Sequence, residues 1–238
     1  MAATQTTPSG RFDDLDSPSI ERSDLSARLA GFGAIAFVAV VVIQNLIRGA
    51  TAPQNDAATA DVVRYYTDHR DISVVLSVTF VVSGIALALF LGGAMRRLAT
   101  GPGRGWAYTG FAGAVAIMML FASMVAAEGA LSVLGTRPDP SPSAIDALWA
   151  LHNSMFTVLF LAIGIALLGL GRAGVASGVT PRAFTWIAPI GLGLLAIAAA
   201  AGPFIAAGQA MPMFALGGLG FLAWLAYLAT TGARLIRR

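Results

Sequence analysis

The chain has 238 residues, of which 57% are hydrophobic and 11% are charged. Soluble domains average about a quarter charged residues, so this chain has too little charge to cover a water-soluble surface. The composition excludes soluble enzymes, disordered proteins and disulfide scaffolds, and leaves a membrane protein. The sequence also lacks Cys and Lys, which excludes thiolate metal sites, Schiff-base chemistry and a P-loop lysine.

The first element is a polar segment over residues 1–28. It contains five acidic residues, and residues 2–19 are rich in Thr, Ser, Pro and Asp. Such a composition cannot bury enough apolar surface to fold, and it lacks the apolar stretch of a signal peptide. We therefore predict a disordered cytoplasmic tail over residues 1–28.

Six apolar segments follow, each near the roughly 20 helical residues that a bilayer core requires. They lie at approximately 29–47, 72–95, 106–134, 147–170, 184–202 and 211–231. Residues 29–233 are therefore predicted to form one all-α domain, a polytopic bundle of six transmembrane helices. A basic C-terminal tail at 234–238 completes the chain.

The loop between the first two segments is the longest, and it has the pattern of a short helix. Asn55 or Asp56 is placed to cap a helix over residues 57–70. Its apolar and aromatic stripe consists of Val62, Val63, Tyr65 and Tyr66. Because Tyr prefers the headgroup layer of a bilayer, we predict an amphipathic external helix that lies on the outer surface or covers the bundle.

The distribution of arginine predicts the orientation of the spans. With the N-terminus inside, 11 of the 15 Arg residues fall in cytoplasmic segments and four in external ones. Because basic residues are enriched in cytoplasmic loops, both termini are predicted to be cytoplasmic, in a bacterial inner membrane. The basic excess is then a topology signal with some attraction to anionic lipid, and nucleic acid is not expected as a partner.

Polar residues inside spans are costly, so they mark candidate functional positions. Glu128 is the only carboxylate well inside a predicted span, and His152 is the only embedded imidazole. At 1.5 Å rise per residue, both lie roughly 8 to 9 Å below the outer ends of consecutive antiparallel spans, so they can face each other. The other ligand-binding or proton-coupling candidates on this side are Asn153, Gln44, Asn45, Asp71 and His69.

Two interpretations of Glu128 and His152 stay open. In the first, they form the floor of a polar cavity open to the outside, where they bind a ligand or exchange a proton. In the second, a hydrogen bond between them only fixes helix packing. No metal site is expected, because these residues lack zinc-binding spacing; the alternative ligand set is His152, Glu128 and His69. No cofactor is expected, since a bis-histidine haem would need a second embedded His.

Short motifs across residues 26–238 resemble a group of uncharacterised six-span integral membrane proteins of actinobacteria, of a domain-of-unknown-function type. The motifs are SARLAG at 26–31, VRYYTDHR at 63–70, TPR at 180–182 with Trp186, and FLAW at 221–224. The resemblance implies a six-span layout and no particular activity or functional residue.

The sequence therefore predicts a non-enzymatic membrane protein with an outward-facing polar pocket for a lipid or small molecule. The alternative is a small proton- or cation-coupled transporter that uses Glu128 and His152; an intramembrane enzyme is the least favoured class. Expected partners are membrane lipids and a ligand from the outer side. Small residues at four-residue spacing, such as Gly110 and Ala114, favour close helix contacts, within the chain or with a second copy or another membrane protein.

Overall fold

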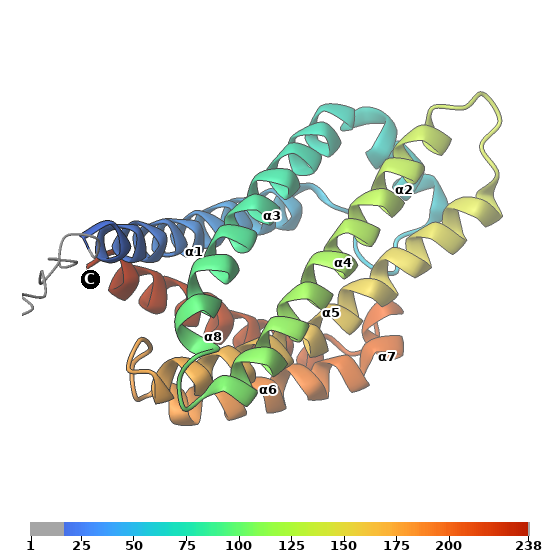
Figure 1. Cartoon of the computed structure of the whole chain (residues 1–238). Coiled ribbons are helices and arrows are strands. Elements are labelled where there is room, and N and C mark those ends of the chain that lie inside the picture. The colour runs from blue at the N-terminus through green and yellow to red at the C-terminus, as the bar shows by residue number, and fades with distance from the viewer. Residues whose placement is uncertain (1–16, 238) are drawn as a thin grey trace, which may run out of the picture.

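The computed structural model describes residues 17–237, with side chains from residue 25 onward, and all of its regular elements are helices (Figure 1). The helices are α1 (Ser17–Thr51), α2 (Thr59–Asp68), α3 (Arg70–Leu98), α4 (Arg104–Gly135), α5 (Pro142–Ala176), α6 (Phe184–Ala200), α7 (Gly202–Ala206) and α8 (Met211–Ile236). The fold is therefore all-α over this part of the chain, as predicted.

The six long helices form a closed ring. In this ring α3 lies between α1 and α4, α5 between α4 and α6, and α8 between α6 and α1. Successive long helices run in opposite directions, so the ring has two ends (Figure 1). We call one the α2 end, which contains α2, α7 and residues 136–141, and the other the basic end, which contains residues 25–28, 96–104, 172–184 and 234–237.

Five of these helices are long and apolar enough to cross a membrane. They are α3, α4, α5, α8 and the part of α1 from Leu25 to Thr51, whereas α6 is shorter, at 17 residues. Large apolar side chains such as Phe32, Val78 and Trp186 point outward and are exposed. This combination indicates a multi-pass membrane protein, because a lipid-facing surface needs no polar cover.

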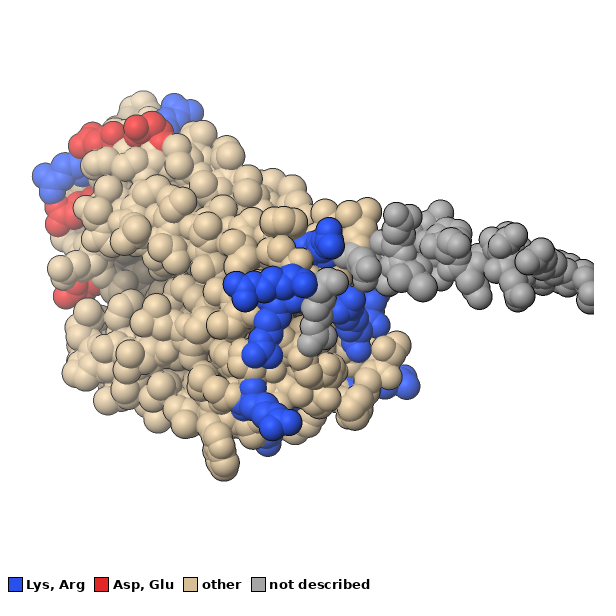
Figure 2. Space-filling model, turned by 90° about the vertical axis from the view of Figure 1, so that its left-hand side faces the viewer, with Lys and Arg blue, Asp and Glu red and all other residues tan. Residues whose placement is uncertain are grey.

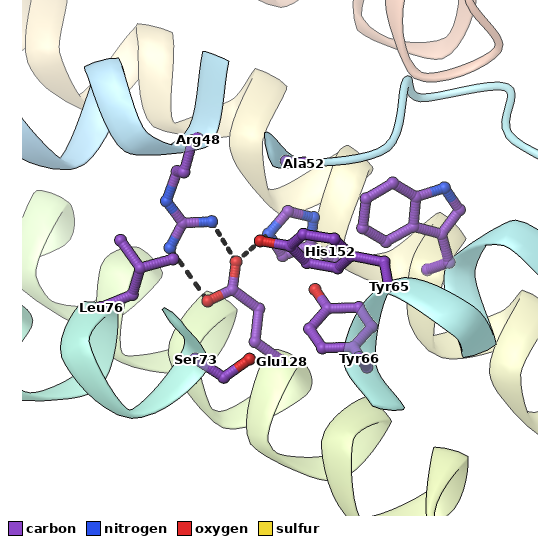
Figure 3. A pocket seen from close by; sticks show the side chains of 9 residues that line it. Arg48, Ala52, Tyr65, Tyr66, Ser73, Leu76, Glu128 and His152 are labelled. Carbon is purple, nitrogen blue, oxygen red and sulfur yellow. Dashed lines mark hydrogen bonds and ion pairs between the residues drawn. The ribbon is translucent and has the colours of Figure 1, made fainter. Parts of the chain in front are cut away.

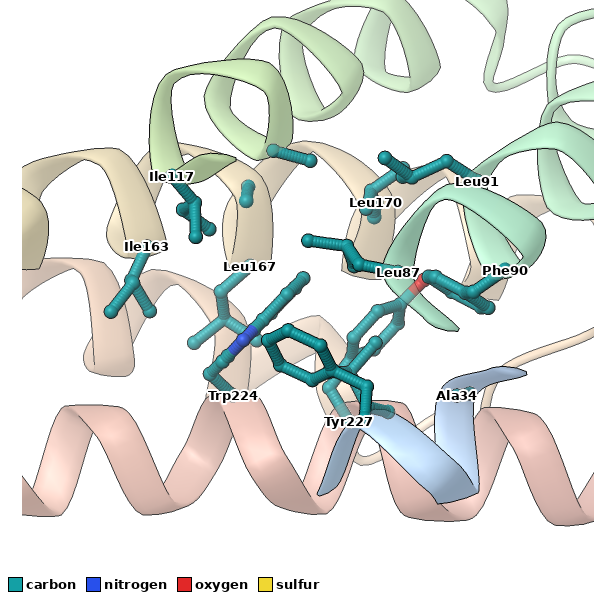
Figure 4. Packing of buried hydrophobic residues seen from close by; sticks show 14 of the residues in the cluster. Ala34, Leu87, Phe90, Leu91, Ile117, Ile163, Leu167, Leu170, Trp224 and Tyr227 are labelled. Carbon is teal, nitrogen blue, oxygen red and sulfur yellow. The ribbon is translucent and has the colours of Figure 1, made fainter. Parts of the chain in front are cut away.

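The centre of the ring is filled by large side chains from α3, α5 and α8 (Figure 4). They include Leu87, Phe90, Leu167, Leu170, Trp224 and Tyr227, all buried. The Trp224 and Tyr227 rings are stacked with centroids 5.6 Å apart, and the Phe90 ring meets Tyr227 at 6.3 Å. In lipid such dispersion contacts hold helices together, because the hydrophobic effect does not drive one apolar helix onto another.

Glycine brings the backbones of α4 and α5 into direct contact. A Cβ atom on Gly169 would lie 2.2 Å from the Gly110 nitrogen, and one on Gly113 would lie 2.5 Å from the Ala166 nitrogen. Only a residue without a side chain fits at such a crossing. The small residues of 110–114 therefore serve contacts inside this chain.

The first helix of the structure begins earlier than the predicted first span. Residues 1–16 of the predicted tail lie outside the described residues, but α1 begins at Ser17, well before the boundary expected at residue 28. Pro18 stands in the first turn, where its fixed φ favours a helix start. Ala27 is buried, and the Ser26 carbonyl oxygen lies 2.6 Å from where a Cβ on Gly93 would be. Contacts with α3 and buried side chains thus begin at residues 26 and 27, within the segment predicted as a tail. At the other end, α8 continues to Ile236, and Leu235 in the predicted tail is buried.

The glycine contact yields a stability prediction. Gly110→Ala should lower the free energy of unfolding by about 1–3 kcal/mol, because the added methyl group forces α4 and α5 apart. Gly129→Ala on the same helix is the matched control, since nothing lies within 4 Å of its Cβ position. The measurement is thermal unfolding in detergent, and a Gly110→Ala protein as stable as Gly129→Ala would contradict the close crossing.

Candidate functional site

Three titratable side chains from three helices meet at the α2 end (Figure 3). The two Nη atoms of Arg48, at the end of α1, donate to the two carboxylate oxygens of Glu128 on α4; the Nη2–Oε2 distance is 2.9 Å. The Nε2 atom of His152 on α5 lies 3.0 Å from Glu128 Oε1. We call Arg48, Glu128 and His152 the Glu128 cluster.

The cluster is mostly shielded from solvent. The Glu128 and His152 side chains are each 9% exposed, and Arg48 is 22% exposed. A carboxylate at such a position is strongly destabilising unless a cation and hydrogen bonds compensate it. The two-fold contact with a guanidinium does both, since its N–H groups match the two carboxylate oxygens.

His152 is held in its position by its neighbours on α5. Its Nδ1 atom lies 3.2 Å from the Asn153 Oδ1 atom, and its ring stacks on Trp149 at 5.2 Å with planes 3° apart. The Asn153 amide and the Trp149 indole each donate to the Asn55 carbonyl at 3.1 Å. One turn of α5 therefore orients the imidazole and also anchors the loop before α2.

These bonds explain a difference from the sequence-based expectation at the start of α2. The Asn55 side-chain amide donates to the Ile205 carbonyl in α7, so it is not used as a helix cap. The helix begins at Thr59 instead of residue 57, after Ala58, which makes no side-chain cap bond. It ends at Asp68, and the non-helical backbone at His69 separates it from α3.

The short helix α2 covers the Glu128 cluster. Tyr65 and Tyr66 face the cavity beside Arg48 and Glu128. Beneath the helix lies a small apolar cluster, separate from the main core, that consists of Val62, Tyr65, Tyr66, Leu131, Ile145 and Trp149. Within the described residues, three side-chain hydrogen bonds join α2 to other elements: Thr59 to Asp146 at 2.5 Å, Thr67 to Gly135 at 3.2 Å, and Tyr65 with Thr51 at 3.4 Å. The predicted amphipathic helix thus covers the end of the bundle, and few side-chain hydrogen bonds attach it there.

The cavity under α2 is small. Its volume is about 20 Å³, and its lining consists of Arg48, Ala52, Tyr65, Tyr66, Ser73, Leu76, Glu128, Trp149 and His152. A water molecule needs roughly 10–15 Å³ of this kind of space. The cavity in this conformation therefore holds about one water molecule, and a larger ligand enters only if α2 moves.

The remaining candidate residues lie around the cluster and not in its cavity. Gln44 is buried one turn before Arg48 and donates to Thr79 at 2.9 Å. Asn45 donates to its own helix at the Val41 carbonyl, and the exposed Asp71 lies at the start of α3. His69 stacks on Tyr65 at 5.1 Å, but no three His, Cys, Asp or Glu residues within the described part of the chain are grouped to hold a metal ion. The alternative set of His152, Glu128 and His69 is therefore not assembled.

Arg48 is the residue that the sequence-based reasoning missed. It falls just after the predicted end of the first span, where its charge by itself indicates only the orientation of the spans. Two signals point to it in retrospect. It lies four residues after Gln44, on the same face of the helix, and a carboxylate such as Glu128 inside a membrane domain requires a cationic partner.

Comparison with protein-family models gives no match to this chain, and comparisons with curated proteins and with solved structures give none either. The chemistry available at the site follows from its contacts. A paired guanidinium and carboxylate, ringed by Tyr65, Tyr66 and Trp149, can exchange their mutual bond for bonds to a ligand.

The ion pair yields a test of stability. Arg48→Met or Glu128→Met alone should cost about 3–5 kcal/mol, because each leaves an uncompensated buried charge, whereas the double variant should be nearly neutral. Asp61→Ala is the control: it breaks the exposed Arg64–Asp61 pair on α2 and should cost less than about 1 kcal/mol. Unfolding free energies in detergent provide the comparison, and additive single costs in the double variant would contradict the coupling.

Tyr66 yields a test of pH dependence. Burial raises the pKa of Tyr66, and the negative charge of Glu128 raises it further. The folded state thus disfavours the phenolate, so stability is complete below the unfolded pKa of about 10 and is lost as the pH rises above it. Tyr66→Phe should flatten the decline in melting temperature above about pH 10. Tyr108→Phe, at a half-exposed ring on α4, is the control, and its melting temperature should decline with pH like that of the wild type. If Tyr66→Phe showed this same decline, Tyr66 would not contribute to the pH dependence.

Proposed function

We propose that the protein is a six-span protein of the bacterial cytoplasmic membrane with both termini cytoplasmic. Acidic side chains gather at one end of the ring and most of the arginines at the other (Figure 2). From residue 25 to 237, every acidic side chain lies at the α2 end: Asp56, Asp61, Asp68, Asp71, Glu128, Asp139 and Asp146. The basic end has eight arginines in the same range: Arg28, Arg96, Arg97, Arg104, Arg172, Arg182, Arg234 and Arg237. The positive-inside rule then assigns the basic end to the cytoplasm and the α2 end to the outside.

The sixth span in this proposal is α6. Its 17 residues are the lower limit for crossing a bilayer core. Because α5 ends at the basic end and α8 begins at the α2 end, the chain has to return between them, and α6 makes this return along both helices.

We further propose that the Glu128 cluster binds a small zwitterionic molecule, free or as a lipid headgroup, from the outer side. The observation that carries this function is the shielded ion pair between Arg48 and Glu128 beneath α2, a helix that packs in an apolar cluster separate from the main core. The protein thereby acts as a binding component of the membrane and not as an enzyme.

The charges of the cluster select the class of ligand. An anion that took Arg48 would leave Glu128 without its guanidinium, and a cation that took Glu128 would leave Arg48 unpaired; either outcome is costly at a shielded site. A zwitterion compensates both, since its acidic group replaces Glu128 on Arg48 while its ammonium group replaces Arg48 on Glu128. The rings of Tyr65, Tyr66 and Trp149 line the same space and favour an ammonium group through cation–π attraction.

Access in this proposal depends on α2. The cavity of about 20 Å³ is too small for a zwitterion, so the helix has to move outward for the ligand to enter. An apolar cluster separate from the main core and three side-chain hydrogen bonds hold α2 in place, so it can open without disturbing the main core. The non-helical residue His69 provides a joint between α2 and α3.

Proton- or cation-coupled transport through Glu128 and His152 is less well supported than binding. The interior between the cluster and the basic end is filled by apolar side chains such as Leu87, Leu167 and Trp224. Near the basic end, the buried Thr180 and Thr231 hydroxyls are 3.1 Å apart and bond to each other. A transporter needs polar groups along its pathway, and this interior offers few.

The proposed function is tested by ligand-induced stabilisation. Free amino acids, matched amines and matched carboxylic acids are added to the detergent-solubilised protein, and the melting temperature is measured. We expect amino acids alone to raise it, in the wild type and in Asp61→Ala but not in Arg48→Met/Glu128→Met. If the ligand is a headgroup, native mass spectrometry should instead show phosphatidylethanolamine retained by the wild type and lost by the double variant. Absence of both effects would leave the cluster as a packing device.

The role of α2 is tested in the same assay with a tether. Because the chain has no cysteine, Thr59→Cys/Asp146→Cys introduces a single possible disulfide at a contact of 2.5 Å. Oxidation should abolish ligand stabilisation, and reduction should restore it. The single variant Thr59→Cys is the control for the oxidant, and binding that survives the closed tether would rule out entry beneath α2.

A further inference from the structure

A second feature of the molecule lies far from the Glu128 cluster, on the lipid-facing surface near the basic end. It is a surface groove between α1 and α3, with a volume of about 410 Å³. Its walls are Leu29 on α1 and Ile85 and Leu89 on α3, each about half exposed. Arg96 closes the groove at the basic end.

The groove results from the close contact of α1 with α3. Gly93 lies against the Ser26 carbonyl and the Ala30 side chain, so the two helices approach at this point. Gly92 beside it is exposed, and nothing lies within 4 Å of its Cβ position. Gly93 thus allows the close approach of the two helices, and Gly92 leaves open space beside it where another residue would place a side chain.

The length of the groove matches one leaflet of a bilayer. From Ile85 to Arg96 the rise along α3 is roughly 16 Å at 1.5 Å per residue. A hydrocarbon core is about 30 Å thick, so one leaflet is about half of that. A groove of this length accommodates one acyl chain from the membrane surface to the midplane.

The charge at the end of the groove indicates the headgroup. Arg96 is exposed and forms no ion pair within residues 25–237. Arg97 follows it on α3, Arg28 lies two residues after Ser26 on α1, and every acidic residue of this range is at the other end of the ring. A guanidinium binds a phosphate through two parallel hydrogen bonds, and among the side chains of residues 25–237 no acidic group competes for it at this end.

We propose that this groove is a binding site for an anionic phospholipid, with one acyl chain between Leu29 and Leu89 and the phosphate at Arg96. The site is independent of the Glu128 cluster, because it lies at the opposite end and takes a ligand of different charge. The lipid comes from the leaflet at the basic end. The groove retains it more strongly than the general attraction between a basic surface and anionic lipids would.

Native mass spectrometry of the purified chain with added phosphatidylglycerol or phosphatidylcholine tests this site. The wild type should retain phosphatidylglycerol in preference to phosphatidylcholine. Arg96→Gln should reduce that retention about fivefold, whereas Arg96→Lys should keep part of it. Gly92→Leu should also reduce it, because the new side chain fills the groove and leaves Arg96 in place.

Two matched variants distinguish specific binding in the groove from general attraction of the lipid to exposed arginines. Arg182→Gln removes an exposed arginine of the basic end between α5 and α6, and Gly193→Leu adds a side chain to α6 where nothing lies within 4 Å. Both should retain phosphatidylglycerol like the wild type, as should Arg48→Met/Glu128→Met. Equal losses in the Arg96 and Arg182 variants, or wild-type retention in Gly92→Leu, would overturn the proposal. Melting temperatures measured in parallel show whether each variant is folded.

Discussion

The contact between Arg48 and Glu128 is the interaction on which the organisation of the α2 end depends. Within the ring, α1 packs on α3 and α8, whereas α4 and α5 pack mainly on each other. The long Arg48 and Glu128 side chains span the space between α1 and α4, and His152 extends the link to α5. A carboxylate shielded from water requires this compensation, so the pair determines how the end of α1 is placed against α4.

The two ends of the ring differ because charge is placed differently in each. At the α2 end, acidic and basic groups occur together, and one pair of them is shielded under α2. At the basic end, arginine stands without an acidic partner among the described residues, next to an apolar groove. A mixed pair suits a ligand with both charges, and isolated arginines suit an anion. Between the ends lies an apolar core around Trp224 and Tyr227, which separates the two kinds of chemistry.

Much of the fold follows from composition and periodicity alone. Apolar segments of membrane-spanning length predict the long helices; α1, α3, α4, α5 and α8 extend beyond the predicted segments, whereas α6 ends two residues earlier. The amphipathic stripe of Val62, Tyr65 and Tyr66 predicts α2 and its buried face, all three residues being buried. The equal depth of Glu128 and His152 on consecutive spans predicts that they can meet, and in the structure they do. The start of α1 at Ser17 was less predictable, because the first residues of this helix have the polar composition of a tail.

The sequence by itself determined that this is an all-α membrane chain, with charge concentrated at the helix ends and polar groups gathered near Glu128. Those properties follow from the cost of polar atoms in lipid, which acts on each segment separately. Only the tertiary structure decided that Arg48 is the partner of Glu128 and that Asn55 anchors a loop instead of capping a helix. It also decided that Gly92 and Gly93 leave a groove. Each of these depends on which helices become neighbours, and that is decided by close contacts such as those of Gly110 with Gly169 and Gly93 with Ser26.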